Sequence, residues 1–318
     1  MRGEPDGTSV RTALPFVDGL MPRADRYPRP KWEEIAARVT EAAPMDENAA
    51  WRSIAERWAE EHCAAAGAAY ACTRSENFIL ASPLEKRPAA NLIAFAERAR
   101  RGISRALRGL AATDGLGPHV IMVFETEDEY YEYIAPFYAD GGHYAGSSGV
   151  HLNSGYGHFA LPRREPDLLE TVVAHELTHA LISHLPLPRW LDEGIAVNLE
   201  SSLCPRYGRR LELSWIERHR NWWDPESVQQ YWSGLAFHRP DKISELSYEL
   251  AWVTVRSLAE NYELFRLFAS EASSEDAGQG ASHKHFGHGL GKHFEALLGD
   301  GEWEPDPTAW QEASTNTA

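Results

Sequence analysis

The sequence predicts an α+β protein, in which a small mixed sheet with an edge strand precedes a mostly helical region. Residues 119–124, HVIMVF, form a continuous apolar run of strand length, which is typical of a buried strand. Residues 141–162 are rich in glycine and contain two short extended pieces, which favours edge strands or loops over central strands. After Arg206 the apolar residues recur mostly with helical spacing.

The remaining elements follow from apolar spacing and from the residues that end helices. In the first half of the chain we expect helices at 32–43, 49–66, 89–110 and 127–138, and strands at 69–72, 78–82 and 119–124. The two extended pieces of the glycine-rich segment are 149–153 and 158–161. Later helices are expected at 167–185, 191–201, 247–260 and 293–298. The helix at 167–185 should end at Pro186.

The length of 318 residues suggests about two lobes. Residues 1–30 are rich in Pro, Gly, Arg and Asp and are expected to be flexible. An α+β lobe should cover 31–185, and a mostly helical lobe should cover 186–304. The tail at 305–318 is expected to be disordered.

The composition narrows the class of protein. A formal net charge of −16 disfavours binding to nucleic acid or to anionic membranes. The chain has no signal-peptide core and no apolar run of about 18 residues, so we expect a cytoplasmic protein without a membrane span. Cys63, Cys72 and Cys204 are too few and too scattered for a disulfide framework, which predicts free thiols.

One motif indicates chemistry. His175, Glu176 and His179 spell HELTH within an apolar helix, and two histidines four positions apart share one helix face. Such a pair can take two positions around one zinc ion, while the neighbouring glutamate reaches a bound water from the flank. Two histidines and a glutamate would also be costly to bury in an apolar helix without a purpose.

A third ligand is available on the next helix. Glu193 follows His179 after thirteen intervening residues, and the Leu-Pro-Leu-Pro link between them reverses the chain. Two histidines and one glutamate leave the fourth zinc position for water, which is typical of a catalytic site rather than a closed structural one.

HELTH followed by RWLDEGIAVNLE resembles the gluzincin metallopeptidases. The second segment is similar to the WLxEGxA motif of the aminopeptidase-N-like family, and the spacing is closer to that of bacterial peptidase MA-like proteins. The resemblance implies a zincin-like fold, one Zn²⁺ per chain held by His175, His179 and Glu193, and Glu176 as general base. Glu200 matches a second acid that is common seven residues after the ligand glutamate.

The chain also departs from these families. It lacks the Gly-x-Met-Glu-Asn motif that binds a substrate amino terminus in the aminopeptidases. Val197 stands where thermolysin-like relatives have an aspartate that orients a zinc histidine. The orienting groups are therefore expected elsewhere, from Glu200 or Asn198, while Asp192 is either a further orienting group or an N-terminal acid of its helix.

The resemblance implies hydrolysis of a peptide or protein substrate by zinc-activated water. Tyr248 is our candidate donor to the oxyanion, with His238 in reserve. The substrate would pair as an added strand with the edge formed by Gly149, Val150, His151, Leu152 and Asn153. His151 and His158 are expected either in the cleft lining or on the surface.

Two other classes of function remain open from the sequence. One is a zinc-binding scaffold without turnover, and the other is a zinc hydrolase of a non-peptide amide. The histidine-rich run at 283–293 lacks paired ligands on one element, so we expect a solvated loop followed by a helix start. The sequence does not indicate an oligomeric state.

Overall fold

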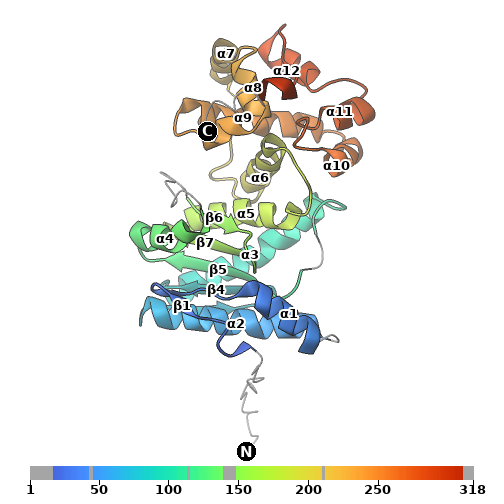
Figure 1. Ribbon diagram of the computed structural model, residues 1–318. Coiled ribbons are helices and arrows are strands. Elements are labelled where there is room, and N and C mark those ends of the chain that lie inside the picture. Colours follow the sequence, from blue (N-terminus) through green and yellow to red (C-terminus); the bar gives the residue numbers. More distant parts are fainter. Residues whose placement is uncertain (1–16, 43–45, 113–114, 139–147, 210–211, 311–318) are drawn as a thin grey trace, which may run out of the picture. The chain divides into compact units, whose positions relative to one another are not determined.

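The computed structural model describes residues 17–42, 46–112, 115–138, 148–209 and 212–310 (Figure 1). They form a mixed α+β structure, as the sequence predicts. They divide into two compact units, of which unit 1 lies within 1–93, 115–142 and 152–163 and unit 2 within 94–114, 143–151 and 164–318. The division passes through helix α3 (Lys86–Ala106) and strand β6 (Val150–Leu152). Unit 2 thus contains both helices of the motif, between which the sequence analysis set a boundary.

The larger sheet has five strands in the order β3-β4-β5-β7-β6. Their bounds are β3 Ala71–Arg74, β4 Phe78–Ser82, β5 His119–Phe124, β6 as above and β7 His158–Pro162. Strand β3 is antiparallel to β4, whereas β4, β5 and β7 are parallel, so the sheet is mixed as expected. Both β4 and β5 have the predicted bounds because each is a continuous apolar run that the fold buries.

The glycine-rich segment is predicted correctly at one piece and wrongly at the other. Strand β6 lies at the sheet edge, as expected for the piece at 149–153. Strand β7, however, lies between β5 and β6, so the prediction of an edge strand or loop at 158–161 is wrong. The reason is that the glycines of the segment all precede β7, whereas all five residues of the strand itself are buried.

Unit 1 also contains a small hairpin in the segment that was expected to be flexible. Strands β1 (Arg23–Ala24) and β2 (Tyr27–Pro28) pair antiparallel, and the Tyr27 side chain is fully buried. This part of residues 1–30 is therefore more ordered than its composition predicts, and residues 1–16 lie outside the described residues. The helices of unit 1 are α1 Trp32–Ala42, α2 Glu47–Ala66, α4 Glu127–Ile134 and the 3₁₀ helix η2 Ala135–Phe137.

The core of unit 1 includes two buried histidines. The His62 ring stacks on Tyr27 with ring centroids 4.9 Å apart, and neither ring nitrogen has a hydrogen-bond partner among the described residues. His158 Nδ1 lies 3.0 Å from the Tyr156 carbonyl and Nε2 lies 2.8 Å from the Tyr133 hydroxyl. From the sequence, His158 is expected in a cleft lining or on the surface. That expectation is wrong, because β7 is an interior strand and the side chain is fully buried.

Unit 2 is mostly helical, as predicted for the later part of the chain. Its helices are α5 Pro166–Ile182, α6 Arg189–Leu203, α7 Leu213–Trp222, α8 Ser227–Trp232, η3 Leu235–His238, α9 Lys242–Leu258, α10 Tyr262–Glu271, α11 Gln279–Phe286 and α12 Gly291–Leu298. Helix α9 begins five residues before the predicted start because the Asp241 side chain accepts from the Ile243 N–H and caps it. Helix α11 replaces the loop expected in the histidine-rich run.

Helix α6 packs closely against α9 because of one glycine. A Cβ atom at Gly194 would lie 2.5 Å from Val255 Cγ2 and 2.8 Å from the Ala251 carbonyl oxygen, too close for any side chain. The two helix backbones can therefore approach only where residue 194 lacks a side chain. Gly194 follows Glu193 directly, so this contact fixes the part of α6 that carries the third predicted ligand.

Two further predictions concern the ends of the chain and the membrane. Residues 307–310 of the expected disordered tail are helical, and Trp310 Nε1 donates to the Gln229 side chain at 3.1 Å. Residues 311–318 lie outside the described residues. Across the described ranges, no helix has the length and apolar character needed to span a membrane.

Candidate metal centre

Helix α5 brings the two predicted histidine ligands together. His175 and His179 are one turn apart, with ring centroids 4.8 Å apart and Nε2 atoms 3.1 Å apart. The helix begins with Pro166 at its first position, where a missing N–H is tolerated, and ends at Ile182. The Ala112 N–H donates to the Leu181 carbonyl at 2.7 Å and so satisfies one of the free carbonyls of the last turn.

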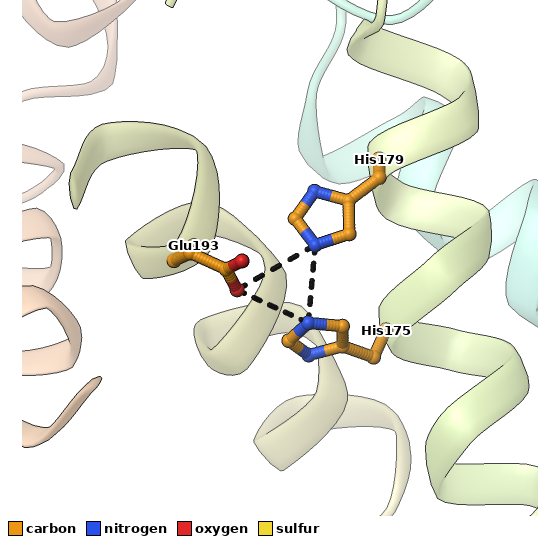
Figure 2. Close-up of side chains that lie close together, drawn as sticks. All are labelled: His175, His179 and Glu193. Carbon is orange, nitrogen blue, oxygen red and sulfur yellow. Dashed lines mark hydrogen bonds and ion pairs between the residues drawn. The ribbon is translucent and has the colours of Figure 1, made fainter. Parts of the chain in front are cut away.

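Helix α6 supplies the third predicted ligand. Glu193 Oε2 lies 3.2 Å from His175 Nε2 and 3.5 Å from His179 Nε2. Figure 2 shows the carboxylate and both imidazoles pointing toward one common point, from α6 and α5 respectively. Within the described residues this is the only group of three or more His, Cys, Asp or Glu side chains close enough to hold one ion.

The three donor atoms fit a small tetrahedral metal ion. Zinc bound at about 2.0–2.1 Å with tetrahedral angles keeps its donors about 3.3 Å apart. The three separations here are 3.1, 3.2 and 3.5 Å. Glu193 Oε2 is also buried and accepts no hydrogen bond from the described residues, which is unfavourable for a carboxylate oxygen unless a cation binds it. The geometry and the orphaned oxygen both favour a metal ion at this point.

Each histidine is oriented by its own carboxylate. His175 Nδ1 lies 3.0 Å from Glu200 Oε2, and His179 Nδ1 lies 2.8 Å from Asp192 Oδ1. Because each Nδ1–H donates to a carboxylate, each Nε2 keeps its lone pair for a metal, as is usual for histidine ligands. Glu200 and Asp192, both considered from the sequence, therefore lie where orienting groups are needed.

Asn198, the other orienting group considered from the sequence, lies away from the histidines. Its side-chain amide donates to the Gly194 carbonyl at 2.7 Å and to the Trp252 carbonyl at 2.9 Å. These bonds join α6 to α9, so Asn198 strengthens the contact made possible by Gly194 rather than orienting a ligand.

Arg189 is a residue of this site that the sequence analysis missed. Its guanidinium donates to Glu193 Oε1 at 2.6 Å. This bond occupies one carboxylate oxygen and leaves Oε2 directed at the two histidines. Arg189 stands four positions before Glu193 on the same helix, so the spacing of oppositely charged residues was the signal that could have revealed it.

The charges around the histidines favour their protonated form when no metal is bound. Burial alone lowers the pKa of His175, but contacts with Glu193 and Glu200 outweigh it and raise the pKa to about 9. Burial is likewise outweighed at His179, where Glu193 and Asp192 raise the pKa well above its usual value. A metal ion must therefore displace protons from the imidazoles, so metal affinity should depend on pH.

Glu193 is held as a carboxylate despite its burial. Its side chain is only 1% exposed, and burial alone would raise its pKa. The positive charges of the two imidazoles and of Arg189 outweigh this effect and hold the pKa well below its usual range. The imidazoles of His175 and His179 remain 17% and 14% exposed, so solvent reaches part of each side chain.

Glu176 lies beside the three ligands and is held by the backbone of the edge strand. The His151 N–H donates to Glu176 Oε2 at 2.8 Å. Burial raises the pKa of Glu176, and the positive charges of the two histidines only partly oppose it. The carboxylate is therefore more basic than a solvated one, which suits a group that accepts a proton near neutral pH.

Tyr248 and His238 both lie near enough to the ligands to sense their charge. Burial and then the charge of Glu193 raise the pKa of Tyr248, whose hydroxyl is also within hydrogen-bonding reach of Arg189. Burial and then the charge of Arg189 lower the pKa of His238, so its imidazole is neutral. The Tyr248 ring packs edge-on against Phe237 at 5.2 Å, which fixes its position on α9.

A large cavity elsewhere in unit 2 does not include the candidate ligands. His184 is exposed beyond the end of α5. A cavity of about 1010 Å³ is lined mainly by residues of α8, α12 and the segment 301–310, and His175, His179 and Glu193 are not among its lining residues. The three converging donor atoms, not the size of a cavity, therefore identify the candidate site.

No protein-family model matches this chain, and no curated protein matches it significantly. The interpretation of the site therefore depends on the geometry and chemistry of its own residues.

Proposed function

We propose that the protein is a zinc-dependent metallopeptidase that hydrolyses peptide bonds with Glu176 as general base. The observation that carries this proposal is the convergence of His175 Nε2, His179 Nε2 and Glu193 Oε2 within 4.8 Å of one another, with the Glu176 carboxylate beside them. Three protein ligands leave a position for water and substrate, whereas structural zinc sites have four.

Each residue has a defined task in this mechanism. When bound, zinc would polarise the scissile carbonyl and lower the pKa of water. Glu176, kept basic by burial and oriented by the His151 N–H, takes a proton from the attacking water and passes it to the leaving amine. Tyr248 donates its hydroxyl hydrogen to the developing oxyanion, since its raised pKa keeps it protonated.

Arg189 supports the same mechanism indirectly. By occupying Glu193 Oε1, it leaves Oε2 as the oxygen that would hold a metal ion. The substrate chain would lie along the edge strand β6, whose His151 N–H already contacts the base. This arrangement would bring a scissile carbonyl next to Glu176 and favours an extended peptide as substrate.

The test combines metal content with cleavage of a mixed peptide library. We compare the wild type with Glu176→Gln, and we use Glu170→Gln as a matched control on the same helix. We expect one zinc per chain in all three proteins, with cleavage by the wild type and Glu170→Gln only.

The other outcomes separate the alternatives. Zinc in all three proteins without cleavage in any would favour the non-catalytic scaffold or the hydrolase of a non-peptide amide. Cleavage by Glu176→Gln at the wild-type rate would remove Glu176 from the mechanism. Absence of zinc from the wild type, even after incubation with the metal, would overturn the proposal.

A further inference from the structure

Two cysteine thiols of unit 1 face each other, outside the metal centre. Cys63 lies in the last turn of α2 and Cys72 lies in β3, and their Sγ atoms are 3.3 Å apart. Cys63 is buried and Cys72 is half-buried. Cys204 belongs to unit 2, so it serves as an internal reference for an unpaired thiol.

The turn between the two elements explains this approach. The chain leaves α2 through Gly67, whose φ of +128° is readily adopted only by glycine, and the Gly67 N–H donates to the Cys63 carbonyl. The chain then reverses into β3, where Cys72 pairs with Ala81 of β4. Two thiols nine positions apart are thereby brought into contact.

The surroundings make the two thiols chemically different. The hydrogen bond with Cys63 lowers the pKa of Cys72, and the nearby positive charge of Arg74 acts in the same direction against burial. The same hydrogen bond, together with burial, raises the pKa of Cys63. Cys72 is therefore both the more accessible thiol and the one that ionises first, which are the properties of an attacking thiol.

We propose that Cys63 and Cys72 are a disulfide-forming pair that is oxidised reversibly by a small disulfide such as oxidised glutathione. The Cys72 thiolate attacks one glutathione sulfur, and the first glutathione leaves as a thiolate that takes up a proton. The Cys63 thiol then loses its proton and attacks Cys72 Sγ, which releases the second glutathione. The protein loses two hydrogens, and one oxidised glutathione becomes two reduced glutathiones.

The bond would tie the end of α2 to the edge strand β3. Closing this short loop reduces the conformational freedom of the unfolded chain, so the oxidised protein should unfold at a higher temperature. We expect an increase in Tm of about 3–8 °C for the unfolding of unit 1. The effect does not depend on the metal centre, so it stands or falls separately from the proposed function.

The experiment equilibrates the full native chain with glutathione buffers of graded oxidation, starting both from reduced and from oxidised protein. Accessible thiols are then counted in denaturant, intact mass is measured, and the linked peptides are identified after alkylation and proteolysis. Of the three cysteines, we expect one thiol to remain, a mass loss of two hydrogens, and a Cys63–Cys72 linkage. Reduction should restore all three thiols.

Matched variants make the result unambiguous. Cys204→Ala should still form the bond and retain no thiol, whereas Cys63→Ser should instead accumulate one glutathione on Cys72. Cys72→Ser should retain both of its thiols. Three free thiols in the wild type at equilibrium from both directions, a stable glutathione adduct on wild-type Cys72, or a linkage to Cys204 would each overturn the proposal.

Discussion

Unit 1 buries a pair of histidines and unit 2 contains a partly buried pair, and the two pairs are in opposite electrostatic states. In unit 1, burial lowers the pKa of His62 to about 3 and that of His158 to about 4, so both rings are neutral. In unit 2, the contacts of His175 with two carboxylates outweigh burial and raise its pKa to about 9. The first pair packs among aromatic rings, whereas the second is surrounded by carboxylates.

The difference teaches that burial by itself does not identify a metal-binding histidine. The unit 1 histidines make contacts that a neutral ring satisfies, such as the Tyr133 hydroxyl on His158. The unit 2 histidines direct two Nε2 atoms at a buried carboxylate oxygen that accepts no hydrogen bond within the described part of the chain. A positive charge is therefore required at the second pair, and it can be supplied by protons or by a metal ion.

The largest effect should come from removing the third ligand. Glu193→Gln removes the negative charge and leaves only a neutral amide oxygen as a donor, so zinc affinity should fall by more than the roughly 100-fold expected for an orienting residue. Competition with a fluorescent zinc chelator measures this. Glu170→Gln is the control and should bind zinc like the wild type. Equal zinc affinity in Glu193→Gln and the wild type would mean that Glu193 is not a ligand.

A smaller loss is expected when a histidine keeps its place but loses its carboxylate partner. Asp192→Asn removes the negative charge that faces His179 Nδ1. Zinc binding should therefore weaken about 10- to 100-fold. Asn198→Ala provides the contrast, because the Asn198 side-chain amide donates to the Gly194 and Trp252 carbonyls. If Asn198→Ala lost as much zinc affinity as Asp192→Asn, the assignment of orienting groups would be wrong.

His62 and His158 should make the free energy of unfolding decrease at acidic pH. Because the folded pKa values of His62 and His158 lie below the unfolded value of 6.5, the unfolded chain binds more protons as pH falls from about 6.5 toward 4. The stability that each contributes is complete above about pH 6.5, and about 2 kcal/mol per histidine should be lost by pH 5.

His62→Phe tests this directly, because the ring stack on Tyr27 is kept while the titrating group is removed. Urea unfolding of the chelator-treated proteins at pH 7 and at pH 5 gives the free energy of unfolding that each protein loses between these two pH values. This loss should be about 2 kcal/mol smaller in His62→Phe than in the wild type. An unchanged pH dependence would show that His62 is not buried as a neutral ring.

The smallest effect is expected from the backbone contact behind Glu193. In Gly194→Ala, the added methyl group should overpack the contact between α6 and α9, which costs about 2 kcal/mol of stability. The higher helix propensity of alanine should offset about 1 kcal/mol of this loss. The net loss of about 1 kcal/mol is measured by thermal unfolding, together with a zinc titration. Gly115→Ala, where an added Cβ meets no atom within 4 Å, is the neutral control. A Gly194→Ala protein as stable as Gly115→Ala would contradict the close packing of α6 on α9.

The parts of the fold that could be predicted are those with strong local patterns. Strands β4 and β5 and the two motif helices follow from apolar runs, helical spacing and the two prolines that separate α5 from α6. The interior position of β7 could not be predicted, because strand order depends on contacts between distant segments. The hairpin at Arg23–Pro28 was missed for a related reason, since its Tyr27 is stabilised by rings from other elements.

The candidate site likewise has features that the sequence predicts and features that only the structure reveals. The spacing of His175, His179 and Glu193 is a local signal, and the three side chains do converge. The assignment of Glu200 to His175 and of Asp192 to His179 required the structure, because several acids on α6 were equally plausible partners. The contact of the His151 N–H with Glu176 could not be predicted either, because it joins a strand backbone to a helix twenty-five positions away.

The most direct test of the account is X-ray absorption at the zinc edge of the full chain loaded with one equivalent of zinc. The account predicts four-coordinate zinc with two imidazole nitrogens, one carboxylate oxygen and one further oxygen at about 2.0–2.1 Å. Loss of one imidazole contribution in His179→Ala would assign the signal to this site. Zinc with sulfur ligands, six oxygen ligands without imidazole, or no stoichiometric zinc would contradict a catalytic metal centre formed by α5 and α6.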